Sequence, residues 1–314
     1  MTILFITDPV VGGAEKWRAA LAKRLPDMPF RSTEDPDATD ADPADVELVL
    51  CFRARPGAFR GMTRLRAILA TGAGVDGLFE DPELPDVPIA RIVDPWMARQ
   101  MSGWATYAVQ HFYRRFDVYG ALQAAGRWDE QDEWQGAPPK VGLLGYGAIG
   151  QEIGETLRGL GFDVAAWTRG PRDLGRVAHY HGPDGLQTFL ARTHFLINML
   201  PLTPATTGVI DAGMLRRLPK PAFLINMARG RHVVTDDLVA ALEAGALAGA
   251  FLDVTEPEPL PPGHPLWSMP NVRITPHCSG PTNAETAADQ VADNIRRVLA
   301  GEPVENLVPR DRGY

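Results

Sequence analysis

The chain has 314 residues, 45% of them hydrophobic and 22% charged, with a formal net charge of −8. This composition is typical of a globular protein with sizeable cores, and the acidic balance argues against a nucleic-acid-binding surface, which is normally basic. The two cysteines, Cys51 and Cys278, give no disulfide framework, and neither a leader sequence nor an apolar run of about 18 residues is found. We therefore expect a soluble cytoplasmic protein that binds neither membranes nor nucleic acid.

The N-terminal part of the chain predicts a parallel α/β sheet. Apolar runs of strand length alternate there with turn or helix material. The runs lie at Thr2–Thr7, Glu47–Phe52, Leu65–Ala70 and Ile89–Val93. The segment Arg31–Asp45 is acidic, contains proline and has no periodicity, so it is predicted to be a solvated loop.

The middle of the chain predicts a second and stronger α/β series. Apolar residues at helical spacing predict a crossing helix at about 100–120, and a linker at 128–139 follows it. Six predicted strands then alternate with helical patterns such as 148–160 and 236–244. The strands are Lys140–Leu144, Asp163–Trp167, Phe195–Leu200, Ala222–Asn226, Gly249–Asp253 and Val272–Thr275. Such alternation is typical of the doubly wound parallel sheet of dinucleotide-binding (Rossmann) domains.

The last predicted element is a helix at 283–300, which we expect to pack back on the first domain. The N-terminal domain is then discontinuous. We predict a smaller, flavodoxin-like α/β substrate domain built from 1–94 and 285–314, into which a dinucleotide-binding domain at 95–284 is inserted.

A glycine fingerprint lies where the strand Lys140–Leu144 meets the following helical pattern. Gly145 permits a tight turn, Gly147 lets the backbone approach a pyrophosphate, and Gly150 lets helix and strand pack closely. The loop also contains Tyr146, Ala148 and Ile149, and its amides at the helix N-terminus favour bound phosphate. This setting predicts a dinucleotide site.

The next strand predicts which dinucleotide is bound. It ends at Thr168-Arg169, with Arg172 close behind, near the position where an acidic residue would accept a hydrogen bond from the 2′-hydroxyl of NAD. Arginine suits a 2′-phosphate instead, which favours NADPH over NADH. The alternative is that these arginines are ordinary surface charges.

Three candidate catalytic residues follow later strands, where open α/β sheets hold their ligands. Arg229 stands in INMARG, Glu258 in EPEPLPP and His277 in ITPH. Glu256 is an alternative to Glu258, because it is also followed by proline.

Taken together, these motifs resemble those of the D-isomer-specific 2-hydroxyacid dehydrogenases, above all the glyoxylate/hydroxypyruvate reductase branch. The likeness runs over nearly the whole chain. It is carried by ATGAGVDG at 70–77, the glycine fingerprint, PLTPATTGVI at 201–210, INMARG at 225–230, the DV…EPLP…PLW…ITPH series ending at 277 and the C-terminal RGY.

The resemblance implies an oxidoreductase that transfers a hydride from NADPH to the carbonyl carbon of small 2-oxo acids. His277 would supply the proton to the developing alkoxide, Glu258 would orient the imidazole, and Arg229 would bind the carboxylate and polarise the carbonyl. Glyoxylate and hydroxypyruvate are the expected substrates. A larger 2-oxo acid is an alternative within the family, and a dinucleotide-sensing binding protein is an alternative from another class.

The resemblance also implies further contacts. A substrate carboxylate would bind the backbone of Ala73, Gly74 and Val75. The additional cofactor residues would be Met101, Leu200, Pro201, Thr206, Met227, Ala228 and Asp253. No metal site is predicted, and Cys278 is expected to take no part in the reaction. The aromatic helix at 100–120 is expected to form the interface of a homodimer.

Overall fold

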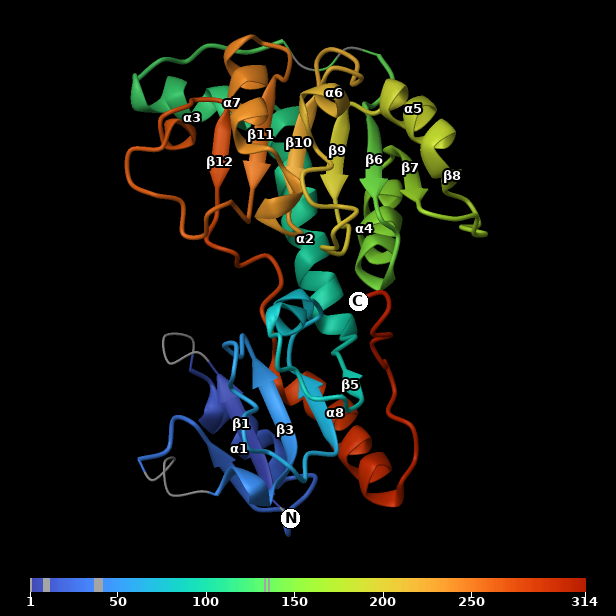
Figure 1. The fold of residues 1–314 in the computed structure, drawn as a ribbon. Helices are drawn as coiled ribbons and strands as arrows, with labels where there is room; N and C mark the ends of the chain where they lie inside the picture. The colour runs from blue at the N-terminus through green and yellow to red at the C-terminus, as the bar shows by residue number, and fades with distance from the viewer. Residues whose placement is uncertain (1, 8–11, 37–41, 133, 135) are drawn as a thin grey trace. The chain divides into compact units, whose positions relative to one another are not determined.

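A computed structural model describes residues 2–7, 12–36, 42–132, 134 and 136–314 (Figure 1). The chain divides into two compact units, one of residues 1–96 and 282–314 and the other of residues 97–281. The domain boundaries expected from the sequence were 94/95 and 284/285. Part of the acidic segment at 31–45, residues 37–41, lies outside the described residues.

The second unit contains a seven-stranded sheet in which every described strand pair is parallel. Its order is β12-β11-β10-β9-β6-β7-β8, so the direction of winding reverses between β6 and β9. The strands are β6 (Lys140–Leu144), β7 (Asp163–Thr168), β8 (Ala178–His181), β9 (Phe195–Asn198), β10 (Phe223–Asn226), β11 (Gly249–Leu252) and β12 (Val272–Ile274). This is the doubly wound Rossmann topology that the sequence predicts.

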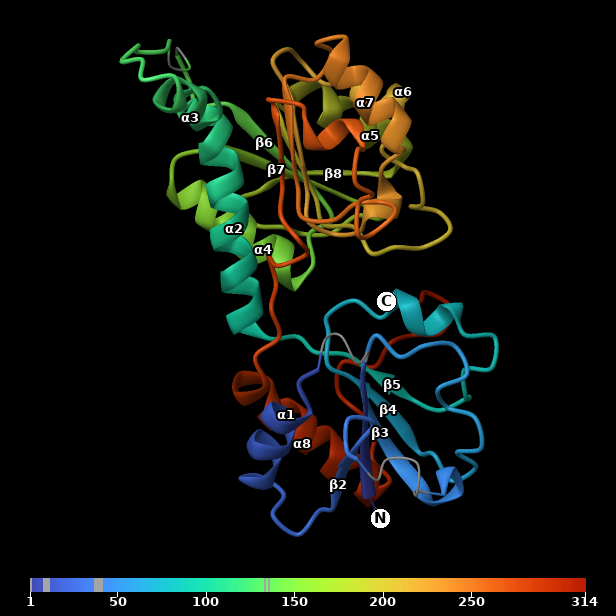
Figure 2. The ribbon, with the colours of Figure 1, turned by 90° about the vertical axis from the view of Figure 1, so that its left-hand side faces the viewer.

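Helices cover both faces of this sheet (Figure 2). One face carries α2 (Pro95–Tyr113) and α4 (Ala148–Gly159), and the other carries α5 (Gly182–Arg192), α6 (Ala212–Leu215) and α7 (Thr235–Glu243). Burial on both faces explains why the central strands read as uninterrupted apolar runs. Within the described part of the chain, no helix has the length and apolar character of a membrane span.

The first unit is a smaller parallel sheet of order β2-β1-β3-β4-β5, the flavodoxin-like order. Its strands are β1 (Thr2–Thr7), β2 (Phe30–Ser32), β3 (Val46–Phe52), β4 (Ala67–Ala70) and β5 (Ile89–Ala90). The helices α1 (Ala14–Ala22) and α8 (Ala284–Ala300) share one apolar core with this sheet. The C-terminal helix therefore belongs to the N-terminal unit.

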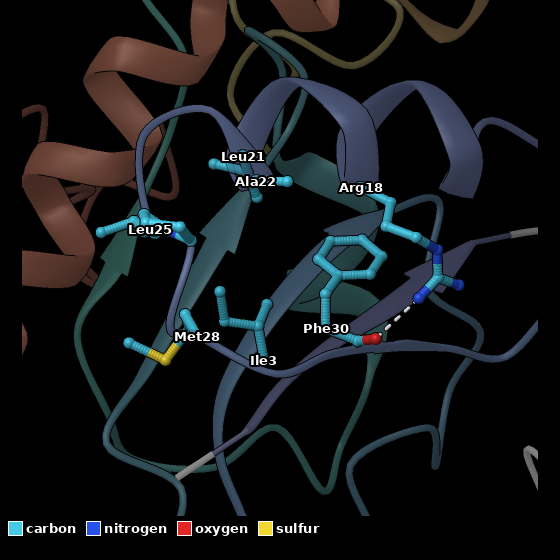
Figure 3. A pocket seen from close by; sticks show the side chains of 8 residues that line it. Ile3, Arg18, Leu21, Ala22, Leu25, Met28 and Phe30 are labelled. Carbon is cyan, nitrogen blue, oxygen red and sulfur yellow. Dashed lines mark hydrogen bonds between the residues drawn. The ribbon is translucent and has the colours of Figure 1, made fainter.

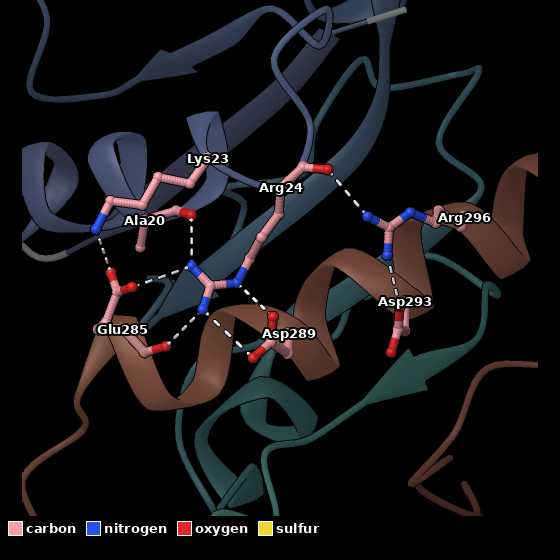
Figure 4. Close-up of polar contacts among 7 residues, drawn as sticks. All are labelled: Ala20, Lys23, Arg24, Glu285, Asp289, Asp293 and Arg296. Carbon is pink, nitrogen blue, oxygen red and sulfur yellow. Dashed lines mark hydrogen bonds and ion pairs between the residues drawn. The ribbon is translucent and has the colours of Figure 1, made fainter.

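An ion-pair cluster joins α1 to α8 (Figure 4). The Arg24 guanidinium donates to the Asp289 carboxylate at 2.6 Å and to the backbone carbonyl of Glu285 at 3.1 Å. Lys23 pairs with the Glu285 carboxylate at 3.1 Å, and this pairing together with Arg24 lowers the pKa of Glu285. The carboxylates of these pairs are solvent-exposed, so each pair contributes little to stability.

A shallow apolar pocket of about 220 Å³ opens beside α1 and β2 (Figure 3). Its one charged lining residue is Arg18, whose guanidinium donates to the carbonyl of Phe30 at 2.7 Å and to Asp35 at 2.5 Å. The charge is therefore already paired within the fold.

Three elements differ from the sequence predictions. The edge strands β2 and β8 are short and mostly polar, so they lack the apolar run that marks a buried strand. The predicted continuous helix at 100–120 is two helices, α2 and α3 (Phe116–Ala124), because Arg115 adopts a left-handed conformation with φ of 58°. The apolar spacing continues across this break, so periodicity could not reveal it.

The position of α8 yields a stability prediction. Ile295 is fully buried in the core of the first unit, whereas Leu299 on the same helix is 40% exposed. We expect Ile295→Ala to lower the free energy of unfolding of this unit by about 2–5 kcal/mol through a cavity. The control Leu299→Ala should change it by roughly 0.5 kcal/mol or less. Equal effects in urea denaturation would contradict the packing of α8 described here.

Candidate active site

Six strands of the second unit end at one register row or, for β7, one residue beyond it. The row consists of Trp167, Leu144, Asn198, Asn226, Leu252 and Ile274, each paired with the next across the sheet. Because all the strands are parallel, the segments that follow these residues emerge at the same edge. The candidate catalytic residues, and the candidate cofactor residues other than Met101 of α2, stand on segments that leave the sheet at this row.

The glycine loop after β6 has the shape of a phosphate cradle. Gly145 has φ of 92°, and a Cβ added to it would lie 2.8 Å from the carbonyl oxygen of Met199. A Cβ on Gly150 would lie 2.7 Å from the carbonyl oxygen of Gly145. A Cβ on Gly147 would meet no described atom within 4 Å, and no side chain caps the N-terminus of α4 there. The loop therefore leaves open the space and the helix amides that a pyrophosphate requires.

The end of β7 places cationic side chains beside this loop. Arg172 donates from Nη1 to the carbonyl oxygen of Tyr146 at 3.2 Å, and Arg169 is exposed to solvent. Thr168 is buried, and its hydroxyl donates to the carbonyl oxygen of Gly170 at 2.7 Å. Two guanidinium groups just after β7 fit a ribose 2′-phosphate, and the buried Thr168 holds the backbone that leads to them through its bond to Gly170.

Beyond β9 and β10 lies a buried polar network that the sequence analysis missed. Asn198, Asn226 and His232 are each at most 1% exposed. The Asn198 amide donates from Nδ2 to Oδ1 of Asn226 at 3.0 Å and to Nδ1 of His232 at 2.9 Å. His232 in turn donates from Nε2 to the carbonyl oxygen of Pro201 at 3.2 Å. This tautomer follows because a carbonyl oxygen only accepts.

The network holds the backbone of two predicted site segments. Asn226 donates from Nδ2 to the carbonyl oxygen of Arg229 at 2.9 Å, and Asn198 Oδ1 accepts from the amide of Leu200 at 3.2 Å. Buried polar groups that are fully paired rigidify their surroundings. The sequence does contain a signal for this network. Two neighbouring strands each end in asparagine, and a histidine follows soon after the second.

Arg229 lies directly after β10 and is half-buried. Its Nη1 donates to the carbonyl oxygen of Ala228 at 2.8 Å. A Cβ on the next residue, Gly230, would lie 1.9 Å from the carbonyl oxygen of Thr255. Only glycine therefore lets the segment carrying Arg229 pass so close to the segment that precedes Glu258.

The candidate acid–base pair is formed by His277 and Glu258. His277 Nδ1 lies 2.7 Å from Oε1 of Glu258, with the two side chains 31% and 35% exposed. The carboxylate accepts, so Nδ1 carries the proton of this hydrogen bond. Of the two glutamates left open by the sequence, Glu258 is the one that contacts the imidazole.

The loop that carries His277 is anchored on Asp253, which is 1% exposed. The carboxylate of Asp253 accepts from the Thr275 hydroxyl at 2.6 Å and from the amides of Cys278 and Ser279, each at 2.9 Å. The backbone carbonyl of Asp253 accepts from the amide of His277 at 2.8 Å. These bonds hold His277 in a left-handed conformation with φ of 51°, which costs about 1–2 kcal/mol in an unsupported chain. The sequence analysis predicted only a cofactor contact for Asp253 and missed its hydrogen bonds to the loop that carries His277.

Several other predicted residues surround these groups. Thr206 Oγ1 donates to the carbonyl oxygen of Pro201 at 2.8 Å, while Met227 and Ala228 are buried between Asn226 and Arg229. Met101 of α2 is buried against Gly280, where an added Cβ would lie 2.8 Å from its sulfur.

The two cysteines lie in different environments, but the pKa of each thiol is raised. Burial raises the pKa of Cys51 to about 12. Partial burial and then the Asp253 carboxylate raise the pKa of Cys278, which disfavours its thiolate although its residue is exposed.

Comparison with known proteins identifies the family. The profile described as "D-isomer specific 2-hydroxyacid dehydrogenase, NAD binding domain" matches residues 107–279, more than half of the chain. The chain belongs to this family. It is 40% identical over 304 residues to a glyoxylate/hydroxypyruvate reductase A of Escherichia fergusonii, a match that covers 95% of this chain and 96% of the relative.

Solved structures of family members agree over the whole length. A D-isomer specific 2-hydroxyacid dehydrogenase of Xanthobacter autotrophicus, in complex with NADPH and MES, matches with a TM-score of 0.93 at 38% identity. An NADPH-dependent glyoxylate/hydroxypyruvate reductase of Sinorhizobium meliloti, in complex with NADP and sulfate, matches with a TM-score of 0.93 at 32% identity. Both matches cover 100% of both chains.

The contact between Glu258 and His277 in this dehydrogenase can be tested by mutation, with the neighbouring Glu256 as a control. We expect Glu258→Gln to lower kcat at least about tenfold, because the neutral amide stabilises the imidazolium less than a carboxylate does. Glu256→Gln, a change of the same chemistry two positions away, should leave kcat near the wild-type value. Steady-state kinetics of both variants test this, and a larger loss in Glu256→Gln would reverse the assignment.

Proposed function

We propose that this family member is an NADPH-dependent reductase of small 2-oxo acids, with glyoxylate and hydroxypyruvate as substrates. The observation that carries the proposal is the contact between His277 and Glu258 at the same sheet edge as Arg229 and the glycine loop. The names of full-length relatives at about 40% identity support the choice of substrates.

In the proposed reaction the bound nicotinamide supplies a hydride to the carbonyl carbon of the substrate. His277, protonated on both nitrogens, donates the Nε2 proton to the carbonyl oxygen as negative charge develops there. Glu258 holds Nδ1 and stabilises the imidazolium before the transfer. The imidazole of His277 must therefore carry a proton on both nitrogens before reduction, and it gives one of them to the substrate in each turnover.

Arg229 is proposed to bind the substrate carboxylate and to polarise the carbonyl. A guanidinium is permanently charged and planar, so it can donate two parallel hydrogen bonds to a 2-oxo acid. In the first unit, the loop after β4 is proposed to contribute backbone contacts from Ala73, Gly74 and Val75. Gly74 is exposed and Ala73 partly exposed, in keeping with a binding loop.

Most of the proposed cofactor residues lie on segments that follow the register row. The glycine loop 145–150 would hold the pyrophosphate, and Thr168, Arg169 and Arg172 the 2′-phosphate. The remaining contacts would come from Met101, Leu200, Pro201, Thr206, Met227, Ala228 and Asp253. Because Asp253 already accepts hydrogen bonds from the His277 loop, any bond it makes to the nicotinamide would couple cofactor position to histidine position.

A direct test mixes the purified protein with NADPH and either glyoxylate or hydroxypyruvate and follows NADPH absorbance. We expect turnover, with His277→Asn lowering kcat about 100-fold or more at nearly unchanged KM. Arg229→Ala should raise KM as well, because it removes a carboxylate contact. Absence of turnover with these and with larger 2-oxo acids would refute the enzyme assignment, and near wild-type kcat in His277→Asn would refute the proton-donor role.

We also propose that the protein is a cytoplasmic homodimer. The two free cysteines fit a reducing compartment. The helices α2 and α3 present Tyr107 and Phe116, which are 57% and 52% exposed and are unusual side chains to leave in water. Light scattering should give twice the chain mass, and Tyr107→Ser with Phe116→Ser should shift it toward one chain; a monomeric wild type would contradict the proposal.

A further inference from the structure

The edge strand β8 places two histidines on the cofactor side of the sheet. Tyr180 packs on Phe189 of α5, so the alternating neighbours His179 and His181 face the opposite side, that of α4 (Figure 2). Their rings lie 5.5 Å apart. The α4 side is the side on which the glycine loop passes into its helix.

His179 is hydrogen-bonded to a proposed cofactor residue. Its Nε2 lies 2.7 Å from the hydroxyl oxygen of Thr168, and that hydroxyl lies 2.7 Å from the carbonyl oxygen of Gly170. The carbonyl only accepts, so Thr168 donates to Gly170 and accepts from His179. Nε2 therefore carries a proton in both charge states of the ring, and Nδ1 is the nitrogen that titrates.

We propose that His179 is a specificity-determining residue of the 2′-phosphate site, gaining a proton when NADPH binds but not when NADH binds. The proposal rests on the proposed function of Thr168, Arg169 and Arg172. Protonation at Nδ1 adds a positive charge beside the phosphate without breaking the bond to Thr168. A phosphate dianion would stabilise this charge, and NADH has no group to do so.

The surroundings of His179 disfavour the protonated form of its ring. Among the residues that the structure describes, two other titratable groups act on it, His181 of its own strand and Arg172 of the loop after β7. Partial burial, then His181, then Arg172 lower the pKa of His179. From β7 it meets Thr168, which does not titrate. The negative charge of a bound 2′-phosphate acts in the opposite direction, toward a higher pKa of His179.

The consequence is a pH-dependent coenzyme preference. A group whose pKa rises on binding strengthens that binding as the pH falls through the bound-state value, and the gain is complete below the free-state value. A rise of about one unit corresponds to a roughly tenfold gain in affinity. The phosphate also titrates near pH 6, and its protonation weakens binding in acid in wild type and variants alike, so the difference between their profiles reports on the coupling to His179.

The test measures the dissociation constants of NADPH and NADH by fluorescence, without substrate, from about pH 8 to about pH 6. His179→Gln keeps an N–H donor for Thr168 and cannot titrate, and His181→Gln is the matched control on the same strand. We expect the ratio of NADH to NADPH dissociation constants to rise with falling pH by up to about tenfold more in wild type and His181→Gln than in His179→Gln. A pH profile in His179→Gln that matches wild type would overturn the proposal.

A second readout separates failure of this proposal from failure of the proposed function. The imidazole C2 proton of His179 is followed by NMR with 2′,5′-ADP or with 5′-AMP, which lacks the 2′-phosphate. We expect the first ligand alone to raise the pKa of His179. Arg169→Ala should weaken NADPH binding at every pH. If Arg169→Ala behaves so while the pKa of His179 does not move, this proposal fails alone; if wild type binds neither NADPH nor 2′,5′-ADP, the proposed function fails.

Discussion

The second unit depends on one geometric constraint, the common register in which its parallel strands end. Paired residues from Trp167 to Ile274 form a single row across six strands. Parallel strands deliver their following segments to the same edge, and the winding reverses between β6 and β9, which is where open α/β sheets generally hold their ligands. Residues more than a hundred positions apart in the chain, such as Gly145 and His277, thus come to the same edge without any long-range contact specific to each pair.

Buried polar groups fix the positions of the segments that leave the sheet at this shared edge. Asp253 accepts hydrogen bonds from the loop that carries His277, and Asn198, Asn226 and His232 tie the segments around Pro201 and Arg229 to each other. Burying such groups is costly unless every one is paired, and a register shift would leave several unpaired. The same pairing supports the left-handed backbone of His277, which local preference alone disfavours. Rigid support of this kind is what an acid–base group needs to meet its substrate reproducibly.

Groups suited to phosphate and groups suited to a 2-oxo acid follow different strands along this edge of the sheet. The strands β6, β7 and β8 carry the glycine loop, the arginines and the histidines, groups suited to phosphate. The strands β10, β11 and β12 lead to Arg229, Glu258 and His277, groups suited to a 2-oxo acid. The proposed cofactor-selecting residue His179 can therefore vary without any change to the proposed proton-transfer pair. The net negative charge of the chain does not oppose anion binding, because local cations and helix amides set the potential at each end.

Much of the fold was readable from the sequence, because strands buried on both faces must be apolar runs and helices between them must be amphipathic. The glycine spacing and the positions of Arg229 and His277 after their strands were readable for the same reason, since motif and strand end coincide. The edge strand β8 and the break at Arg115 were not, because neither leaves a hydrophobic signature. Only the tertiary structure could choose Glu258 over Glu256, pair Asp253 with the histidine loop and bring His179 to Thr168. Those contacts are made by short polar side chains across different strands, and their partners are set by register and loop path, which no local pattern encodes.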